Sequence, residues 1–213
     1  MNRDLIDNNF VPLSKFISEE EAAKLADEFI QFNNINRYPS DLTNGIVTSG
    51  NDIGTDDCSV VHNLVSAVEL LCNKTHIISE IVGETVLPTY TFGRIYRNGC
   101  SLLEHVDRQA CEISLTINLR SDKDWPIIIK RPDGQPCAFD MSPGSAVLYL
   151  GCIAPHWRVG TYKGEHFIQT FLHWVRSRGP LSTRIFDMMN DEPPKGWKTS
   201  LISEYKELLA KQR

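Results

Sequence analysis

The spacing of apolar residues changes from helical to strand-like near Thr85, and this change limits the folds available to the chain. Between Glu112 and Leu119, apolar residues alternate with polar ones, as in a strand that turns one face to a core. The same criteria predict strands over residues 89–97, from 105 onward, and over 126–130, 143–149 and 167–175. Seven or eight short strands, separated by turn sequences such as Asn98-Gly99, are typical of a jelly roll or a barrel.

The part of the chain before Thr85 carries helical patterns instead. Ser18 and Glu21 form a capping box, and the apolar residues that follow predict a helix over about 19–32. A second helical region is predicted over 60–82, and Asn73-Lys74-Thr75 could divide it in two. A short C-terminal helix is predicted over about 201–211. Helices followed by a run of strands predict the α+β class.

The chain length of 213 residues suits one domain with its own core. We expect a single domain over 1–213. Within it, residues 1–84 form a helical support region, 85–178 form the β core, and 179–213 form a tail with the last helix.

Composition argues against several kinds of partner and location. The formal net charge is -5, which speaks against a nucleic-acid partner, because phosphate binding needs a basic surface. The sequence shows neither a long apolar segment nor a signal peptide, so we expect a cytoplasmic protein with no membrane partner. The six cysteines include no CxxC pair and are interpreted as free thiols in a reducing compartment. The oligomeric state cannot be deduced from the sequence.

Two histidines and one carboxylate are candidate metal ligands. His105 and Asp107 lie two residues apart, so in a strand their side chains would point the same way. His156 follows about fifty residues later, where another strand could end. A barrel brings strand ends together, and two imidazoles with one carboxylate form the facial triad of non-haem iron(II) sites. The spacing favours a metal site over three satisfied polar residues near loops, although HxD alone is a weak motif.

The order of several motifs strengthens this hypothesis. They are Arg94-Ile-Tyr96-Arg-Asn-Gly99, His105-x-Asp107, Ser114-x-Thr116, Pro143-Gly144, and His156 followed by a final strand. Over about residues 10–175, this order resembles the iron(II)/2-oxoglutarate-dependent dioxygenases, and most of all their prolyl-4-hydroxylase-like branch. The resemblance implies a double-stranded β-helix of the jelly-roll or cupin-like kind, with the N-terminal helices packed on its major sheet. It also implies that His105, Asp107 and His156 hold iron(II).

The resemblance further implies a reaction. In that family, 2-oxoglutarate binds iron(II) and is decarboxylated to succinate, O2 is consumed, and an unactivated C–H bond of the substrate is hydroxylated. The expected substrate is a prolyl or other peptide residue or a small molecule, and ascorbate is a candidate accessory cofactor. The carboxylate of Asp107 favours hydroxylation over halogenation, because related halogenases carry a small residue at that position.

The residue that would bind the distal carboxylate of 2-oxoglutarate departs from the family pattern. The family has Lys or Arg about ten positions after the second histidine, where this chain has His166. Arg158 is the favoured replacement, binding either the cosubstrate or an acidic substrate, and Arg94 is a further basic residue near the proposed iron. Tyr96 and Gln169 are candidates for hydrogen bonds to the cosubstrate.

Two other functional classes stay open from the sequence. The first is a non-catalytic jelly-roll module that keeps a metal for structure or has lost it, which the histidine at position 166 would favour. The second is a zinc-type hydrolase that uses the same ligands, with Glu104 or Glu112 as general base. The complete ligand triad favours the oxygenase.

Overall fold

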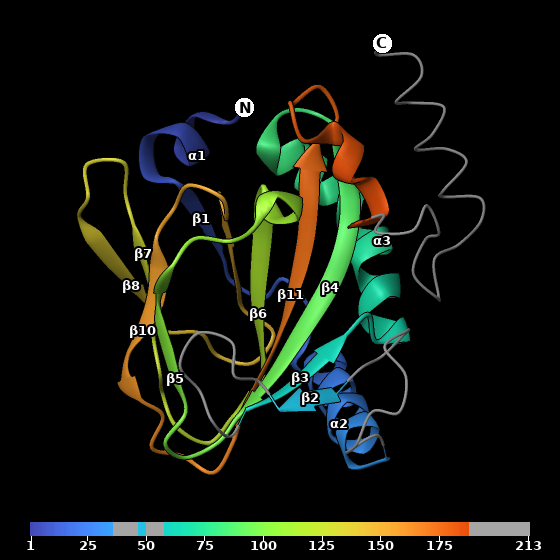
Figure 1. Ribbon diagram of the computed structural model, residues 1–213, viewed down its shortest axis with the longest axis vertical. Helices are drawn as coiled ribbons and strands as arrows, with labels where there is room; N and C mark the ends of the chain where they lie inside the picture. Colours follow the sequence, from blue (N-terminus) through green and yellow to red (C-terminus); the bar gives the residue numbers. More distant parts are fainter. Residues whose placement is uncertain (36–46, 50–57, 188–213) are drawn as a thin grey trace.

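The computed structural model describes residues 1–35, 47–49 and 58–187, and within them two antiparallel sheets face each other (Figure 1). The larger sheet has the strand order β1-β9-β6-β11-β4-β3-β2, and the smaller has the order β5-β10-β7-β8. The strands are β1 (Phe10–Leu13), β2 (Val47–Ser49), β3 (Ser59–His62), β4 (Val86–Tyr96), β5 (Ser101–His105), β6 (Ile113–Ser121), β7 (Ile127–Lys130), β8 (Pro136–Phe139), β9 (Ala146–Tyr149), β10 (His156–Thr161) and β11 (Phe167–Arg176). This is the predicted double-stranded β-helix.

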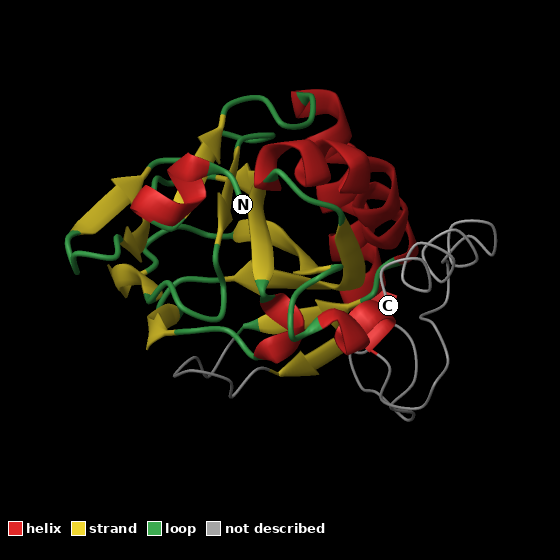
Figure 2. Cartoon of the chain, turned by 90° about the horizontal axis from the view of Figure 1, so that it is seen from above, coloured by secondary structure: helices red, strands yellow, loops and turns green. Residues whose placement is uncertain are grey.

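Helices cover the outer face of the larger sheet (Figure 2). The described α-helices are α1 (Arg3–Asn8), α2 (Glu19–Ile35) and α3 (Val65–Val82), and 3-10 helices follow at Gln109–Cys111 and Ser182–Asp187. Helix α2 packs on β6, and α3 packs on β4 and β11. The expectation that the N-terminal helices pack on the major sheet is confirmed. The helix predicted over 201–211 lies outside the described residues.

The alternation in β6 separates two environments. Leu115 and Ile117 enter the apolar core between the larger sheet and the helices. The residues between them, Ser114 and Thr116, are also fully buried but belong to the opposite face of the strand. That face looks toward the smaller sheet, so the interior between the two sheets receives the polar side chains.

The predicted helical region 60–82 is wrong at its start. Residues Ser59–His62 form β3, in which Val60 pairs with Arg94 of β4, because two buried β-branched residues suit a sheet. The predicted break near Thr75 does not occur. The Thr75 hydroxyl donates to the carbonyl of Leu71 at 2.8 Å and accepts from Trp174 Nε1 at 2.9 Å, so it is satisfied inside a continuous helix.

The cysteines are not all free thiols. Cys58 and Cys100 form a disulfide, and they directly precede β3 and β5. The expectation of six free thiols is therefore wrong for this pair, and the argument for a reducing compartment loses part of its basis. The free cysteines are Cys72, Cys111, Cys137 and Cys152. None of the helices within the described part of the chain has the length and apolar character to cross a membrane.

Gly93 allows α2 to lie directly against β4. A Cβ atom at Gly93 would overlap the ring of Phe29, which is itself 1% exposed. Because side chains alternate along a strand, Phe92 and Arg94 on either side of Gly93 point to the opposite face, into the space between the sheets. The contact between α2 and β4 therefore supports a strand that lines the interior.

We predict that Gly93→Ala destabilises the protein by about 1–3 kcal/mol, because the added methyl group overpacks against Phe29. Denaturant unfolding would measure the loss. The same substitution in a Phe29→Ala background should cost much less, because the obstructing ring is gone. An equal cost in both backgrounds would show that the contact with Phe29 is not the cause.

Candidate metal centre

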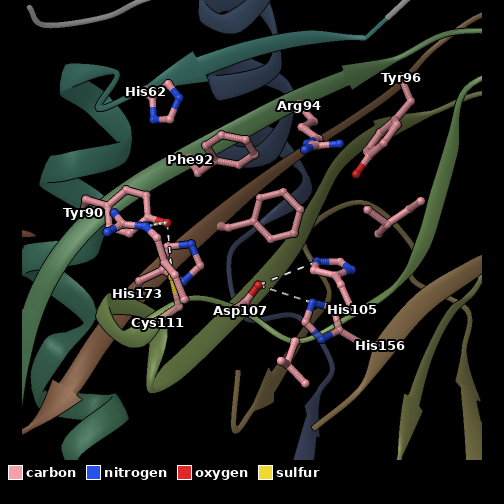
Figure 3. A pocket seen from close by; sticks show the side chains of 14 residues that line it. His62, Tyr90, Phe92, Arg94, Tyr96, His105, Asp107, Cys111, His156 and His173 are labelled. Carbon is pink, nitrogen blue, oxygen red and sulfur yellow. Dashed lines mark hydrogen bonds and ion pairs between the residues drawn. The ribbon is translucent and has the colours of Figure 1, made fainter. Parts of the chain in front are cut away.

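Three side chains converge between the two sheets (Figure 3). Asp107 Oδ1 lies 3.5 Å from His156 Nε2 and 3.8 Å from His105 Nε2. The two imidazole rings are 4.2 Å apart between centroids, because His105 of β5 pairs directly with His156 of β10. One atom from each of the three residues lies within 4.8 Å of the others, so the group could hold a single metal ion.

Asp107 reaches this point by a different route from the one expected. His105 is the last residue of β5, so Asp107 lies in the following loop and not on the same strand. His156 is the first residue of β10, whereas the sequence suggested that a strand could finish there. The backbone N–H of Asp107 donates to the carbonyl of Gly151 at 2.8 Å. Ser114 Oγ donates to Asp107 Oδ2, also at 2.8 Å. A Cβ atom at Gly151 would collide with that carboxylate, so the loop needs glycine there.

Both imidazoles are oriented by the backbone. His105 Nδ1 donates to the carbonyl of Leu103 at 2.8 Å, and His156 Nδ1 donates to the carbonyl of Ala154 at 2.9 Å. A carbonyl can only accept, so each Nδ1 carries a hydrogen, and in the neutral ring this leaves the lone pair on Nε2. This is the usual arrangement of metal-ligating histidines, in which a second hydrogen bond fixes the tautomer and the ring.

The surroundings favour the protonation states that a metal needs. Burial, followed by the nearby charge of His156, lowers the pKa of His105. Burial raises the pKa of Asp107, but the hydrogen bond and charge of His156, with His173 and Ser114, outweigh it and lower this pKa to about 2. His105 is therefore neutral and Asp107 ionised at neutral pH, as metal ligands must be.

A cavity of about 260 Å³ opens beside the three side chains. Alternate residues of β4 form one wall of it, and they are Tyr90, Phe92, Arg94 and Tyr96. Figure 3 shows Arg94 and Tyr96 across the cavity from the two histidines. The structure thus brings two of the predicted cosubstrate residues, Arg94 and Tyr96, to the cavity.

Arg158 and Gln169 lie deeper in the interior and do not line this cavity. Arg158 is 3% exposed; it donates to the carbonyl of Trp125 and, through Nη2, to Gln169 Oε1 at 2.7 Å. Its guanidinium lies 4.4 Å from the ring centre of Phe167. Burial lowers the pKa of Arg158 to about 10. Among the described residues, Arg158 Nε and the buried hydroxyl of Tyr96 have no hydrogen-bond partner.

His166 is not brought to the metal centre. It directly precedes β11, where its backbone N–H donates to Asp122 Oδ1 at 3.0 Å and its carbonyl accepts from Tyr162 at 3.0 Å. The residue is partly exposed and does not line the cavity. The position that carries a basic residue in the family therefore serves a loop contact in this chain.

A polar cluster that the sequence patterns did not predict lies beside Asp107. Ser114 Oγ lies 3.0 Å from His173 Nδ1, His173 stacks on Tyr90 with 4.6 Å between ring centres, and the Tyr90 hydroxyl lies 3.1 Å from Cys111 Sγ. His173 shares a strand face with Gln169 and Phe171, so the period of two in β11 was the available signal.

Asp107, Cys111 and His173 form a second group with metal-ligand spacing. Burial, followed by the charge of Asp107, raises the pKa of the Cys111 thiol far above its usual range. A protonated thiol is a poor ligand. The group of His105, Asp107 and His156 is therefore the better metal site.

Comparisons with known proteins identify the fold. No family model matches the sequence, and no curated protein matches it. Among solved structures, a prolyl-4-hydroxylase of Pseudomonas putida is 14% identical with a TM-score of 0.61, over 81% of this chain and 95% of that chain. The α-ketoglutarate-dependent epimerase SnoN from nogalamycin biosynthesis is 10% identical with a TM-score of 0.65, over 91% and 88%. HygX from Streptomyces hygroscopicus, with nickel and 2-oxoglutarate bound, is 9% identical with a TM-score of 0.61, over 83% and 87%.

The chain therefore has the fold of the 2-oxoglutarate/iron(II) oxygenases, the group that includes the prolyl-4-hydroxylases. The resemblance inferred from the sequence is confirmed at the level of the fold. Identities of 9–14% carry no information on which reaction the chain catalyses.

We predict that Ser114→Ala weakens the binding of a divalent ion such as Mn(II) by roughly 10-fold, because Asp107 loses the hydroxyl that orients its carboxylate. Calorimetric titration would measure the affinity. Ser142→Ala is a matched control, since Ser142 is exposed and bonds to Ser145. Equal affinities in the wild type and Ser114→Ala would show that this hydroxyl does not support the ligand.

Proposed function

We propose that this protein is an iron(II)- and 2-oxoglutarate-dependent oxygenase in which His105, Asp107 and His156 hold the iron. One observation carries the proposal: two imidazoles and one ionised carboxylate converge beside a cavity, with each Nε2 directed toward the carboxylate. Two nitrogens and one carboxylate oxygen suit iron(II) and leave further coordination positions open. The fold of known 2-oxoglutarate oxygenases supports this proposal.

The interior also suits the cosubstrate. No carboxylate among the described residues pairs with Arg158, although its charge is buried. Burying an uncompensated cation is costly, and a carboxylate ligand would offset that cost through charge-assisted hydrogen bonds. We propose that the distal carboxylate of 2-oxoglutarate accepts from Arg158 and from the otherwise unsatisfied hydroxyl of Tyr96. Tyr96 lines the cavity. Burial lowers the pKa of Arg158, and the nearby Tyr96 partly offsets this by raising it.

The remaining residues hold and shield the centre. Ser114 and the Gly151 carbonyl fix Asp107, while the backbone carbonyls fix the two imidazoles. The rings of Phe92 and Phe171 give part of the cavity an apolar lining. When bound, iron(II) with 2-oxoglutarate and O2 would supply the oxidising chemistry, with succinate as a product.

We propose hydroxylation of a C–H bond as the reaction. The carboxylate of Asp107 occupies the position at which related halogenases have a small residue. The structures with this fold include a prolyl hydroxylase in complex with a peptide fragment and an epimerase in complex with nogalamycin RO. Either a peptide residue or a small molecule is therefore compatible with the fold as substrate.

The hydrolase alternative gains no support from its two candidate bases. Glu104 is exposed and pairs with Lys130 at 2.6 Å. Glu112 pairs with Arg176, also at 2.6 Å, and accepts its backbone N–H at 2.9 Å. Neither glutamate lines the cavity, so neither is placed to activate a metal-bound water.

We predict that His105→Ala, Asp107→Ala and His156→Ala each lower the turnover of 2-oxoglutarate to succinate by at least about 100-fold, because a two-ligand site holds iron weakly. The measurement is succinate formation with iron(II), O2 and 2-oxoglutarate. His76→Ala is the control, because His76 is exposed on α3. Unchanged turnover in any one of the three variants would remove that residue from the ligand set.

We predict that Arg158→Gln weakens 2-oxoglutarate binding by roughly 10- to 100-fold, the value of a charge-assisted hydrogen bond of about 1.5–3 kcal/mol. His166→Gln should leave the affinity within a factor of about two, because His166 is partly exposed and its described contacts, to Asp122 and Tyr162, are made by its backbone. An anaerobic titration of the iron(II) protein, followed by visible absorption, would give both affinities. A larger loss in His166→Gln than in Arg158→Gln would transfer the role to His166.

A further inference from the structure

His173 of β11 lies beside Asp107, on the side away from the two candidate histidine ligands (Figure 3). It is 3% exposed. His173 pairs across the larger sheet with Ser114 of β6, and this register brings His173 Nδ1 to 3.0 Å from Ser114 Oγ. Ser114 Oγ in turn donates to Asp107 Oδ2 at 2.8 Å. The hydroxyl of Ser114 therefore connects the imidazole to the carboxylate.

The single hydrogen of the Ser114 hydroxyl sets the direction of these bonds. Two acceptors compete for it, Asp107 Oδ2 at 2.8 Å and the carbonyl of Cys111 at 3.2 Å. The carboxylate is the closer and, because it is charged, the stronger acceptor. The bond to His173 then uses a lone pair of Oγ, so His173 Nδ1 is the donor. A chain of hydrogen bonds thus runs from His173 through Ser114 to Asp107.

The ring of His173 is held in a fixed orientation by its neighbours. It stacks on Tyr90 with 4.6 Å between ring centres, and it lies parallel to Phe171, with 6.3 Å between ring centres and an interplanar angle of 4°. Side chains that are locked by packing hold a metal ligand more precisely than freely rotating ones. His173 therefore offers its Nδ1 hydrogen to Ser114 from a constant position.

The chain acts on the carboxylate oxygen that does not face the two imidazoles. Asp107 Oδ1 lies 3.8 Å from His105 Nε2 and 3.5 Å from His156 Nε2, whereas Oδ2 accepts from Ser114. Fixing Oδ2 restrains the rotation of the carboxylate and keeps Oδ1 directed at the point where a metal would lie. Without the donor of His173, the Ser114 hydroxyl could turn to its second acceptor, and Asp107 would lose this restraint.

We propose that His173 is a positioning residue of the metal centre, which orients Asp107 through the hydroxyl of Ser114. This inference deepens the proposed function, because it assumes that Asp107 is a metal ligand. It places His173 outside the ligand set, although a nitrogen of His173 lies within 4.8 Å of a carboxylate oxygen of Asp107. Residues that orient a ligand in this way typically change metal affinity by roughly 10- to 100-fold.

The test compares two substitutions of His173 by their affinity for Mn(II), measured by calorimetric titration. His173→Leu removes the donor and should weaken Mn(II) binding roughly 10-fold. His173→Asn keeps an N–H close to the position of Nδ1 and should recover most of that loss. His76→Leu is the matched control, because His76 is exposed on α3. Denaturant unfolding of each metal-free variant confirms that the affinities belong to folded protein.

A double-mutant cycle tests whether His173 acts through Ser114. In a Ser114→Ala background, His173→Leu should change the Mn(II) affinity by less than about twofold, because the connecting hydroxyl is already gone. An equal loss in both backgrounds would overturn the proposal, since His173 would then act without Ser114. Unchanged affinity in His173→Leu, or no recovery in His173→Asn, would also overturn it, because the ring would then serve packing alone.

Failure of the wild type to bind Mn(II) would instead contradict the proposed function. In that case the ¹³C signal of the Asp107 carboxyl group in the metal-free protein decides the orienting role of His173. We expect this signal to move in His173→Leu and to return toward its wild-type position in His173→Asn. A signal that stays in place in both variants would overturn the proposal independently of any metal.

Discussion

The pairing of β5 with β10 is the constraint on which the candidate site depends. It places His105 opposite His156, while β10 pairs on its other side with β7. Asp107 is then held from the loop at Gly151 and from Ser114 of β6, a strand of the larger sheet. The three candidate ligands are thus fixed by both sheets at once, and a shift of either strand by one residue would turn one histidine away from the other two side chains.

The stability needed for this polar interior comes from the opposite face of the larger sheet. There α2 and α3 cover an apolar core in which Leu71, Ile78 and Trp174 are fully buried. The space between the sheets instead contains the buried arginines Arg94 and Arg158, the imidazoles of His105, His156 and His173, and unsatisfied polar atoms such as the hydroxyl of Tyr96. Groups of this kind oppose folding, and they persist at sites that bind ligands because the surrounding structure compensates for them.

In the proposed function, the basic residue that binds the cosubstrate would come from a different position from the one that the family pattern predicts. The family places this residue at the start of the last strand, where His166 bonds to a loop through its backbone. Arg158 stands on β10, on the same face as His156, and its charge enters the interior from the smaller sheet. In the proposed complex the cation would thus come from a different strand and approach the same region between the sheets.

The sequence determined the α+β class, the strands β4, β6, β7, β9 and β11, the capped helix at Glu19 and the identity of the three candidate ligands, because hydrophobic period, capping and residue chemistry are local properties. Tertiary structure alone decided that 59–62 is a strand, that Asp107 is held from a loop, and that Arg158 and not His166 enters the interior. It also decided that His173 and Cys111 join the cluster around Asp107. These features depend on which distant strands pair and on the cost of burying charge, and neither is encoded in a short stretch of sequence.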